Sequence, residues 1–339
     1  MNIILLIIIL AILVLSHELG HFLIAKLWRI RVDEFGFGLP PRAWGKKVGD
    51  TIYSLNWIPF GGFVRIFGEE GDTGEGSFAM KPKLAQASVI VAGVIFNILL
   101  AFVLLWFGLQ TGLPVSVSDF PTHGNELKNQ QVIITHVLPD SPAEIATVPA
   151  GARLLKFKTP EEVSIYVRDH VNESINLVTD KGTYTLVPNP ILGIEMDLIG
   201  EAHLSPTSAI IGATKITYRV TQSTAIGMFT FISNILKGHG SLDGVVGPVG
   251  IAGIIGEASE QGFHAILLIT VILSLSLAVI NLVPFPALDG GRLLFVVIEA
   301  IKGSPISKNI TTVFNMTGFA ILILLMLVIT YQDITKLLA

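Results

Sequence analysis

The sequence predicts a polytopic α-helical membrane protein with one inserted soluble domain, and three observations lead to this fold class. Only 14% of the 339 residues are charged and 51% are hydrophobic, whereas soluble domains carry about 25% charged residues. Four apolar runs are long enough to cross a bilayer as helices. Between the second and third runs, residues 114–200 have the composition of a soluble domain. We therefore expect four transmembrane helices with a small domain inserted between the second and third.

The composition excludes several kinds of site. The chain has no cysteine, so any bound metal must use His, Asp or Glu as ligands. The formal net charge of −4 comes without a basic, aromatic-rich patch, and we expect no nucleic-acid partner. The N-terminus lacks the charged region and cleavage site of a signal peptide. We therefore expect the first apolar run to be retained as a membrane span.

The first apolar run, residues 2–28, contains a His-Glu-x-x-His motif that begins at His17. Residues four apart share a helix face, so His17 and His21 can direct two imidazoles at one zinc ion. Glu18 lies beside them and can accept a proton from an attacking water. A lone histidine on an apolar face would more simply be a hydrogen-bonded core residue. Ionisable groups inside a membrane segment are costly and mark function, so the pair predicts a zinc site.

Residues 29–83 form a polar, basic connection, and this composition favours the cytoplasmic side of the membrane. Short apolar stretches within it are typical of strands. Pro40-Pro41 and Gly61-Gly62 interrupt these stretches. We expect strands at residues 31–38, 51–59 and 62–66.

The second span, residues 84–113, is almost free of charge but contains Asn97. Two interpretations are open for this buried amide. It can form an interhelical hydrogen bond, which small neighbours such as Gly93 permit. It can also support an active site that is built against this helix.

Residues 114–200 alternate short strands with two helices, as in a small β-rich binding domain. Ser141 begins a helix with capping-box spacing, and Pro160 begins a second helix that extends to Asp169. A hairpin crosses the turn at residues 180–182. We expect strands at residues 131–138, 153–157, 174–179 and 183–188.

The third apolar run, residues 262–301, is broken by Pro284 and Pro286 just before Asp289. Proline cannot continue a helix, and unwound backbone at membrane depth is tolerated where it lines a wet cavity. A catalytic zinc takes three protein ligands and keeps one position open, and Asp289 can complete the histidine pair. The alternative is a carboxylate that only caps the helix restarting at Gly290. The histidine pair favours ligation of one zinc ion per chain.

Residues 311–330 form the last span, and the distribution of basic residues sets the expected orientation. With residues 29–83 inside, both termini and the soluble domain lie outside, and His21 and Asp289 lie toward the inner side. Residues 201–261 are expected to hold amphipathic helices on the membrane surface. If residues 208–236 crossed the bilayer, the third span would reverse and carry Asp289 to the side opposite His21, so a site shared by these two residues favours four spans.

Two segments, residues 15–21 and residues 281–291, resemble the site-2 protease family of intramembrane zinc metalloproteases. The branch they resemble is that of the bacterial regulator of sigma-E proteases. The resemblance covers nearly the whole chain and includes residues 247–251 and a single PDZ-like domain at residues 114–200. It implies that Glu18 is the general base and that zinc has three protein ligands, namely His17, His21 and Asp289.

The resemblance also implies residues that bind substrate. Asn281 would hold the backbone of the unwound substrate, and Asn97 would support the active site. The strands around Gly36, Phe37 and Gly38 would form a membrane re-entrant β-hairpin that offers an edge to the substrate. A substrate helix must unwind before hydrolysis, and a sheet edge or an Asn side chain can pair with the released amides. An ordinary turn is the alternative for Gly36 to Gly38.

The family implies an enzyme of the bacterial cytoplasmic (inner) membrane that acts in regulated intramembrane proteolysis. Its substrates would be transmembrane helices of single-pass proteins, such as anti-sigma factors or remnant signal peptides. An upstream site-1-type protease would first trim their outer domains. Residues 148–153 replace the usual Gly-Asp turn of the PDZ-like domain, which favours a size filter over peptide capture.

Two other function classes remain open from the residues alone. A zinc transporter or sensor needs a metal route with further intramembrane His or Asp, whereas the strong set is confined to the two motifs. A non-catalytic membrane scaffold built on the soluble domain would permit the loss of Glu18, which is present. We therefore predict an intramembrane zinc endopeptidase.

Overall fold

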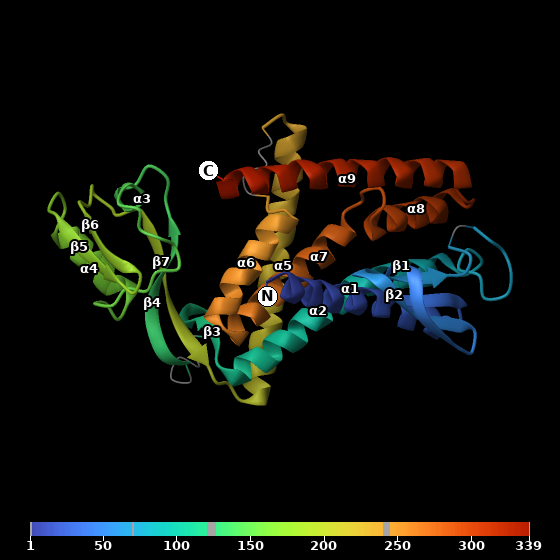
Figure 1. Cartoon of the computed structure of the whole chain (residues 1–339), viewed down its shortest axis with the longest axis horizontal. Helices are drawn as coiled ribbons and strands as arrows, with labels where there is room; N and C mark the ends of the chain where they lie inside the picture. Colours follow the sequence, from blue (N-terminus) through green and yellow to red (C-terminus); the bar gives the residue numbers. More distant parts are fainter. Residues whose placement is uncertain (1, 70, 121–126, 240–244, 339) are drawn as a thin grey trace. The chain divides into compact units, whose positions relative to one another are not determined.

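The computed structural model describes residues 2–69, 71–120, 127–239 and 245–338, and Figure 1 shows the elements that they form. The chain divides into two compact units. One consists of Met1–Leu105 together with Thr214–Ala339, and the other of Trp106–Ala213. The first unit contains the motifs that predict a zinc site.

Among the described residues, four helices are long and apolar enough to cross a membrane. Most of their apolar side chains face outward, as expected of helices whose outer surfaces contact lipid. The chain is thus consistent with a polytopic membrane protein. The four helices are α1 (Asn2–Leu27), α2 (Lys83–Thr111), α7 (Phe263–Leu282) and α9 (Lys308–Leu338).

Two helices precede α7 in the chain, namely α5 (Pro206–Leu236) and α6 (Pro248–Gln261). Neither is among the four candidate spans. The start of α6 is held by Asp333 of α9, a buried carboxylate that accepts a hydrogen bond from the Gly250 N–H at 2.8 Å. A negative charge at a helix N-terminus is favourable, which gives residues 247–251 a structural role.

The connection after α1 forms two long strands, β1 (Val32–Val48) and β2 (Thr51–Ile66), each of which bends and pairs twice. Gly36 pairs with Ser54 on one side and with Phe63 on the other. Successive segments of the sheet are therefore residues 42–48, 51–56, 34–37 and 62–66. Within the described part of the chain, no strand pairs with the outer side of residues 62–66, which leaves that segment as a sheet edge.

The sheet packs against the helices through a buried apolar cluster that joins it to α1, α2 and α8 (Asp289–Lys302). Full burial of one large apolar side chain in such a cluster stabilises the fold by about 1.5–3 kcal/mol. The cluster includes Ala25, four residues after His21 on α1, and fixes the strands next to this helix. Its buried members are Ala25, Ile30, Val32, Ile66, Phe78, Val89, Ile90 and Val296.

The third apolar run is interrupted as the two prolines predict. Helix α7 ends at Leu282 and α8 begins at Asp289. The six-residue connection includes Ala287 with a φ of 69°, a conformation that ends regular structure. Gly290 is buried, and a Cβ there would overlap the carbonyls of residues 282 and 283. The glycine therefore lets α8 start directly against the end of α7.

The second unit is built around a three-stranded sheet in the order β3 (Leu113–Ser116), β7 (Ile194–Ala202) and β4 (Leu127–Val137). The first strand is followed by η1 (Val117–Asp119). Two short helices and a separate hairpin complete it, namely α3 (Pro142–Ile145), α4 (Pro160–Asp169), β5 (Ile175–Thr179) and β6 (Gly182–Leu186).

Two details of this unit differ from the sequence prediction. The strand expected at residues 153–157 is reduced to isolated bridges, in which Arg153 pairs with Ile133 of β4 and Leu154 pairs with Thr179 of β5. The central strand β7 was not predicted. Most of its side chains are only partly buried, without a clear alternation of buried and exposed positions, and its partners β3 and β4 are distant in sequence. Helix α4 has the predicted bounds.

Candidate metal centre

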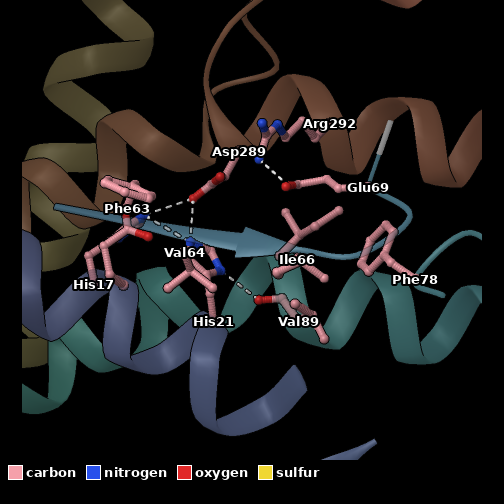
Figure 2. Close-up of a pocket in the computed structure, with 12 residues that line it drawn as sticks. His17, His21, Phe63, Val64, Ile66, Glu69, Phe78, Val89, Asp289 and Arg292 are labelled. Atoms are coloured by element: carbon pink, nitrogen blue, oxygen red, sulfur yellow. Dashed lines mark hydrogen bonds and ion pairs between the residues drawn. The ribbon is translucent and has the colours of Figure 1, made fainter. Parts of the chain in front are cut away.

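Helix α1 presents His17 and His21 on one face, and both side chains are buried, with 8% and 9% of their surface exposed. The long apolar run forms the helix, and Gly20 allows close approach to α2, because a Cβ there would overlap the Ala92 carbonyl. His21 Nδ1 lies 2.8 Å from the Val89 carbonyl oxygen, as Figure 2 shows. A carbonyl can only accept, so Nδ1 carries the proton and Nε2 keeps its lone pair.

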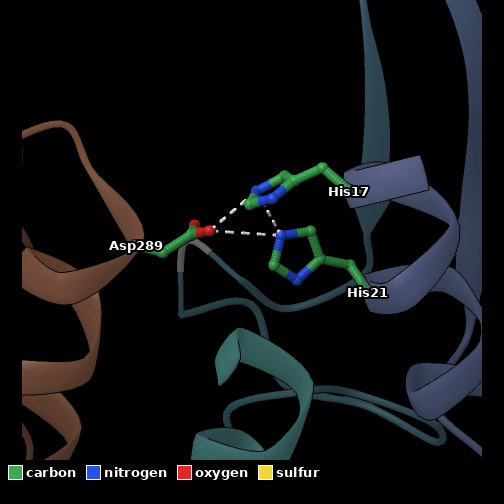
Figure 3. A group of neighbouring side chains, drawn as sticks. All are labelled: His17, His21 and Asp289. Atoms are coloured by element: carbon green, nitrogen blue, oxygen red, sulfur yellow. Dashed lines mark hydrogen bonds and ion pairs between the residues drawn. The ribbon is translucent and has the colours of Figure 1, made fainter. Parts of the chain in front are cut away.

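Asp289, the first residue of α8, completes a group of three ligand atoms with the two imidazoles (Figure 3). Its Oδ2 lies 2.9 Å from His17 Nε2 and 3.3 Å from His21 Nε2. The two Nε2 atoms are 3.1 Å apart. The atoms therefore form a nearly equilateral triangle that opens toward a cavity.

This triangle fits a zinc ion. Zinc–ligand distances of about 2.0–2.2 Å in a tetrahedral site place the ligand atoms about 3.3–3.6 Å apart, and the three separations of 2.9, 3.1 and 3.3 Å equal this spacing or fall a few tenths of an ångström short of it. Asp289 Oδ2 is buried and has no hydrogen-bond donor of suitable geometry in the described part of the chain. Two imidazole nitrogens and a carboxylate oxygen directed at one another are arranged as ligands of one cation. Nitrogen and oxygen donors of this kind are ordinary zinc ligands.

Glu18 and the three ligand residues line one cavity of about 200 Å³ (Figure 2). The edge segment of the sheet forms another wall through Phe63, Val64 and Ile66. It comes close to the glutamate, since a Cβ built at Gly62 would lie 3.6 Å from Glu18 Cγ. The cavity therefore brings a carboxylate, the ligand atoms and an unpaired strand edge together.

An ion pair between Glu69 and Arg292 forms the remaining polar wall of this cavity (Figure 2). Neither residue was identified from the sequence. The available signal was weak: Arg292 follows Asp289 by three positions and so shares its face of α8. Glu69 lies in the loop after β2, which local sequence patterns do not position.

The two asparagines predicted to serve the site, Asn97 and Asn281, lie at different places relative to the cavity. Asn97 of α2 is fully buried beside the site, and its Nδ2 lies 3.5 Å from His17 Nδ1. It therefore makes an interhelical contact and also reaches a metal-site histidine. Asn281 lies in the last turn of α7 and is not among the residues that line the cavity.

The substrate edge expected at Gly36, Phe37 and Gly38 is not a free edge, because both Gly36 and Phe37 are paired on two sides. The strands bend at Gly38 and Gly61, with φ values of 79° and 80°, conformations that favour glycine. These bends fold β2 around both sides of the start of β1. The free edge beside Glu18 is residues 62–66 instead.

Comparison of the sequence with known proteins identifies the family of this chain. Residues 5–325 match Peptidase family M50. A relative in Clostridium acetobutylicum, named as a zinc metalloprotease, is 31% identical over 98% of this chain and 97% of its own length. The zinc metalloprotease RasP of Geobacillus kaustophilus is 27% identical over 96% of this chain and 95% of its own length. The chain therefore belongs to peptidase family M50, the site-2 protease family of zinc metalloproteases.

Proposed function

We propose that this zinc metalloprotease is an intramembrane endopeptidase in which His17, His21 and Asp289 hold the zinc and Glu18 is the general base. The observation that supports this most directly is the triangle of ligand atoms, with edges of 2.9–3.3 Å, in the same cavity as Glu18. When bound, zinc supplies Lewis-acid polarisation of the scissile carbonyl and of the attacking water. Glu18 takes the proton from that water and delivers it to the leaving amine.

The substrate is proposed to bind in extended form along residues 62–66. An unwound segment of a helix has amides that must find new partners, and an unpaired strand edge supplies them by β-augmentation. This edge lines the cavity with Phe63 and Val64, so a segment added to it would pass the glutamate. Asn281 retains a proposed role in holding substrate backbone from the end of α7. Gly36 to Gly38 would contribute by supporting the edge from behind.

The proposed substrates are transmembrane helices of single-pass bacterial membrane proteins, such as anti-sigma factors or remnant signal peptides. The four candidate spans and the bacterial relatives support a location in the bacterial cytoplasmic membrane. The active site would lie toward the cytoplasm, with both termini outside. Residues 114–200 would form an outer PDZ-like domain that filters substrates by size after an upstream protease has trimmed them.

The experiment is a cleavage assay on the purified chain in detergent with a tagged single-span substrate, together with measurement of zinc content. Wild type should cleave, a chelator-treated sample should not, and Glu18→Gln should keep one zinc per chain while losing turnover by at least about 100-fold. Turnover that persists in Glu18→Gln would exclude the glutamate as base. Zinc that persists after His17→Ala together with Asp289→Ala would exclude the ligand assignment.

A further inference from the structure

The face of α2 that meets the metal site repeats every fourth residue, at Val89, Gly93 and Asn97. Such residues form one line along a helix. The Val89 carbonyl accepts the proton of His21 Nδ1 at 2.8 Å. Gly93 leaves room for the rings, because a Cβ there would lie 2.5 Å from His21 Nε2 and 2.6 Å from His17 Cε1. Both imidazoles therefore lie against this line of α2.

The tautomer of His17 follows from its place in the triangle. Its Nε2 faces His21 Nε2 and Asp289 Oδ2, so a metal ligand at this position carries its proton on Nδ1. That proton needs an acceptor, because a metal-bound histidine donates its other N–H to a neighbouring group that fixes the ring. The side-chain group beside His17 Nδ1 is the amide of Asn97, at 3.5 Å.

With the Asn97 amide in this orientation, the contact with His17 joins two donors. The Asn97 Nδ2 group faces the Nδ1–H, while Asn97 Oδ1 is buried without a hydrogen-bond partner. The oxygen and nitrogen of an amide have nearly the same shape, so their assignment follows from the hydrogen-bond network. A half-turn of the amide plane places Oδ1 toward His17 and converts the contact into a hydrogen bond. Asn97 itself has no exposed surface, so water does not compete for the site.

The backbone around this amide is also held. Ser274 of α7 donates its hydroxyl to the Asn97 carbonyl at 2.8 Å, and Ser16 of α1 donates to the Phe96 carbonyl at 3.1 Å. These two bonds fix this turn of α2 against both neighbouring helices. The backbone thus fixes the position of the Asn97 side-chain amide, and only the orientation of its oxygen and nitrogen is left to the hydrogen-bond network.

We propose that Asn97 is a positioning residue that accepts the His17 Nδ1 proton through Oδ1, so that α2 orients both histidine ligands. The pair Val89–His21 uses a backbone acceptor and the pair Asn97–His17 uses a side-chain acceptor. This inference rests on the proposed function, since it requires His17 to be a zinc ligand. It differs from a packing role for Asn97 because it depends on an acceptor atom at one position.

The test is the zinc dissociation constant of the purified full-length chain in detergent, measured by competition with a chelating dye. Asn97→Leu keeps the size of the side chain but removes the acceptor, and should weaken zinc binding by about 10–100-fold. Asn97→Asp keeps an acceptor oxygen and should bind zinc within a few-fold of wild type. Ser88→Ala is the matched control, because it removes the hydrogen bond that Ser88 of α2 accepts from Trp28 Nε1, just after α1, without touching an imidazole.

A second readout is the absorption spectrum of the Co²⁺-substituted protein, which reports ligand geometry without activity. The Asn97→Leu spectrum should differ from wild type, and the Asn97→Asp and Ser88→Ala spectra should not. Equal zinc affinity in wild type and Asn97→Leu would overturn the inference. Equal weakening in Asn97→Leu and Asn97→Asp would also overturn it, because an acceptor would then not matter. A wild-type chain that binds no zinc would instead overturn the proposed function.

Discussion

The two histidines of α1 lie against α2, and two of the features that place their rings need no functional side chain. A backbone carbonyl at Val89 and the missing side chain at Gly93 decide how the rings lie. In most helices glycine is unfavourable by about 1 kcal/mol relative to alanine. At Gly93 the glycine is needed because the space of a methyl group is occupied by two imidazoles.

Replacing Gly93 with alanine should therefore impair the metal site while leaving the helix folded. The new Cβ would lie 2.5 Å from His21 Nε2 and 2.6 Å from His17 Cε1, so the rings must move. A displacement of about 1 Å at a reacting centre can lower the rate about 100-fold. We expect Gly93→Ala to lose zinc and cleavage while its helix content, measured by circular dichroism, is retained.

The matched control is Gly227→Ala on α5, where a Cβ would meet nothing within 4 Å. This variant removes a helical glycine in the same way without touching the site. It should keep both zinc and turnover. A Gly93→Ala chain that kept full zinc occupancy and full turnover would mean that the rings have more freedom than these distances allow.

At the scale of elements, the sheet offers its free edge through residues 62–66. The chain has no cysteine, so a single introduced cysteine is unique in the protein. In a Glu18→Gln background, Val64→Cys should crosslink to a cysteine near the scissile bond of a single-span substrate, because Val64 lines the cavity. The crosslinked fraction is measured on a denaturing gel.

The control for that crosslink is Lys46→Cys, which lies in the segment at the opposite side of the sheet, residues 42–48. We expect crosslinking at position 64 to exceed that at position 46 several-fold. Preferential crosslinking at position 46 would place the substrate on the other edge and refute binding along residues 62–66.

The same elements separate what sequence can predict from what it cannot. The spacing of His17 and His21 is a local property of one helix, and the break before Asp289 follows from two prolines, so both could be predicted. The doubled pairing of Gly36 depends on how two bends fold β2 around β1. Strand β7 and the wall formed by Arg292 depend on partners far away in sequence. Local periodicity contains no information about such partners.

At the scale of the whole molecule, the unit Trp106–Ala213 begins and ends in two chain segments that lie side by side. The Gly112 N–H donates to the Ala202 carbonyl at 2.9 Å, and the Leu204 N–H donates to the Leu109 carbonyl at 2.9 Å. A domain whose ends are adjacent can be inserted into, or removed from, a host fold with little disturbance. The proposed size filter can therefore be tested by excision.

We predict that replacing residues 113–201 with a short Gly-Ser linker leaves cleavage of a trimmed single-span substrate within about an order of magnitude of wild type. The same variant should gain cleavage of a substrate that still carries a folded outer domain, which we expect wild type to reject. The reason is that a filter acts by excluded volume and supplies no group to the reaction. If the excised chain lost the trimmed substrate as well, while keeping zinc, the domain would act in substrate capture. If it still rejected the untrimmed substrate, the selection would lie within the membrane unit.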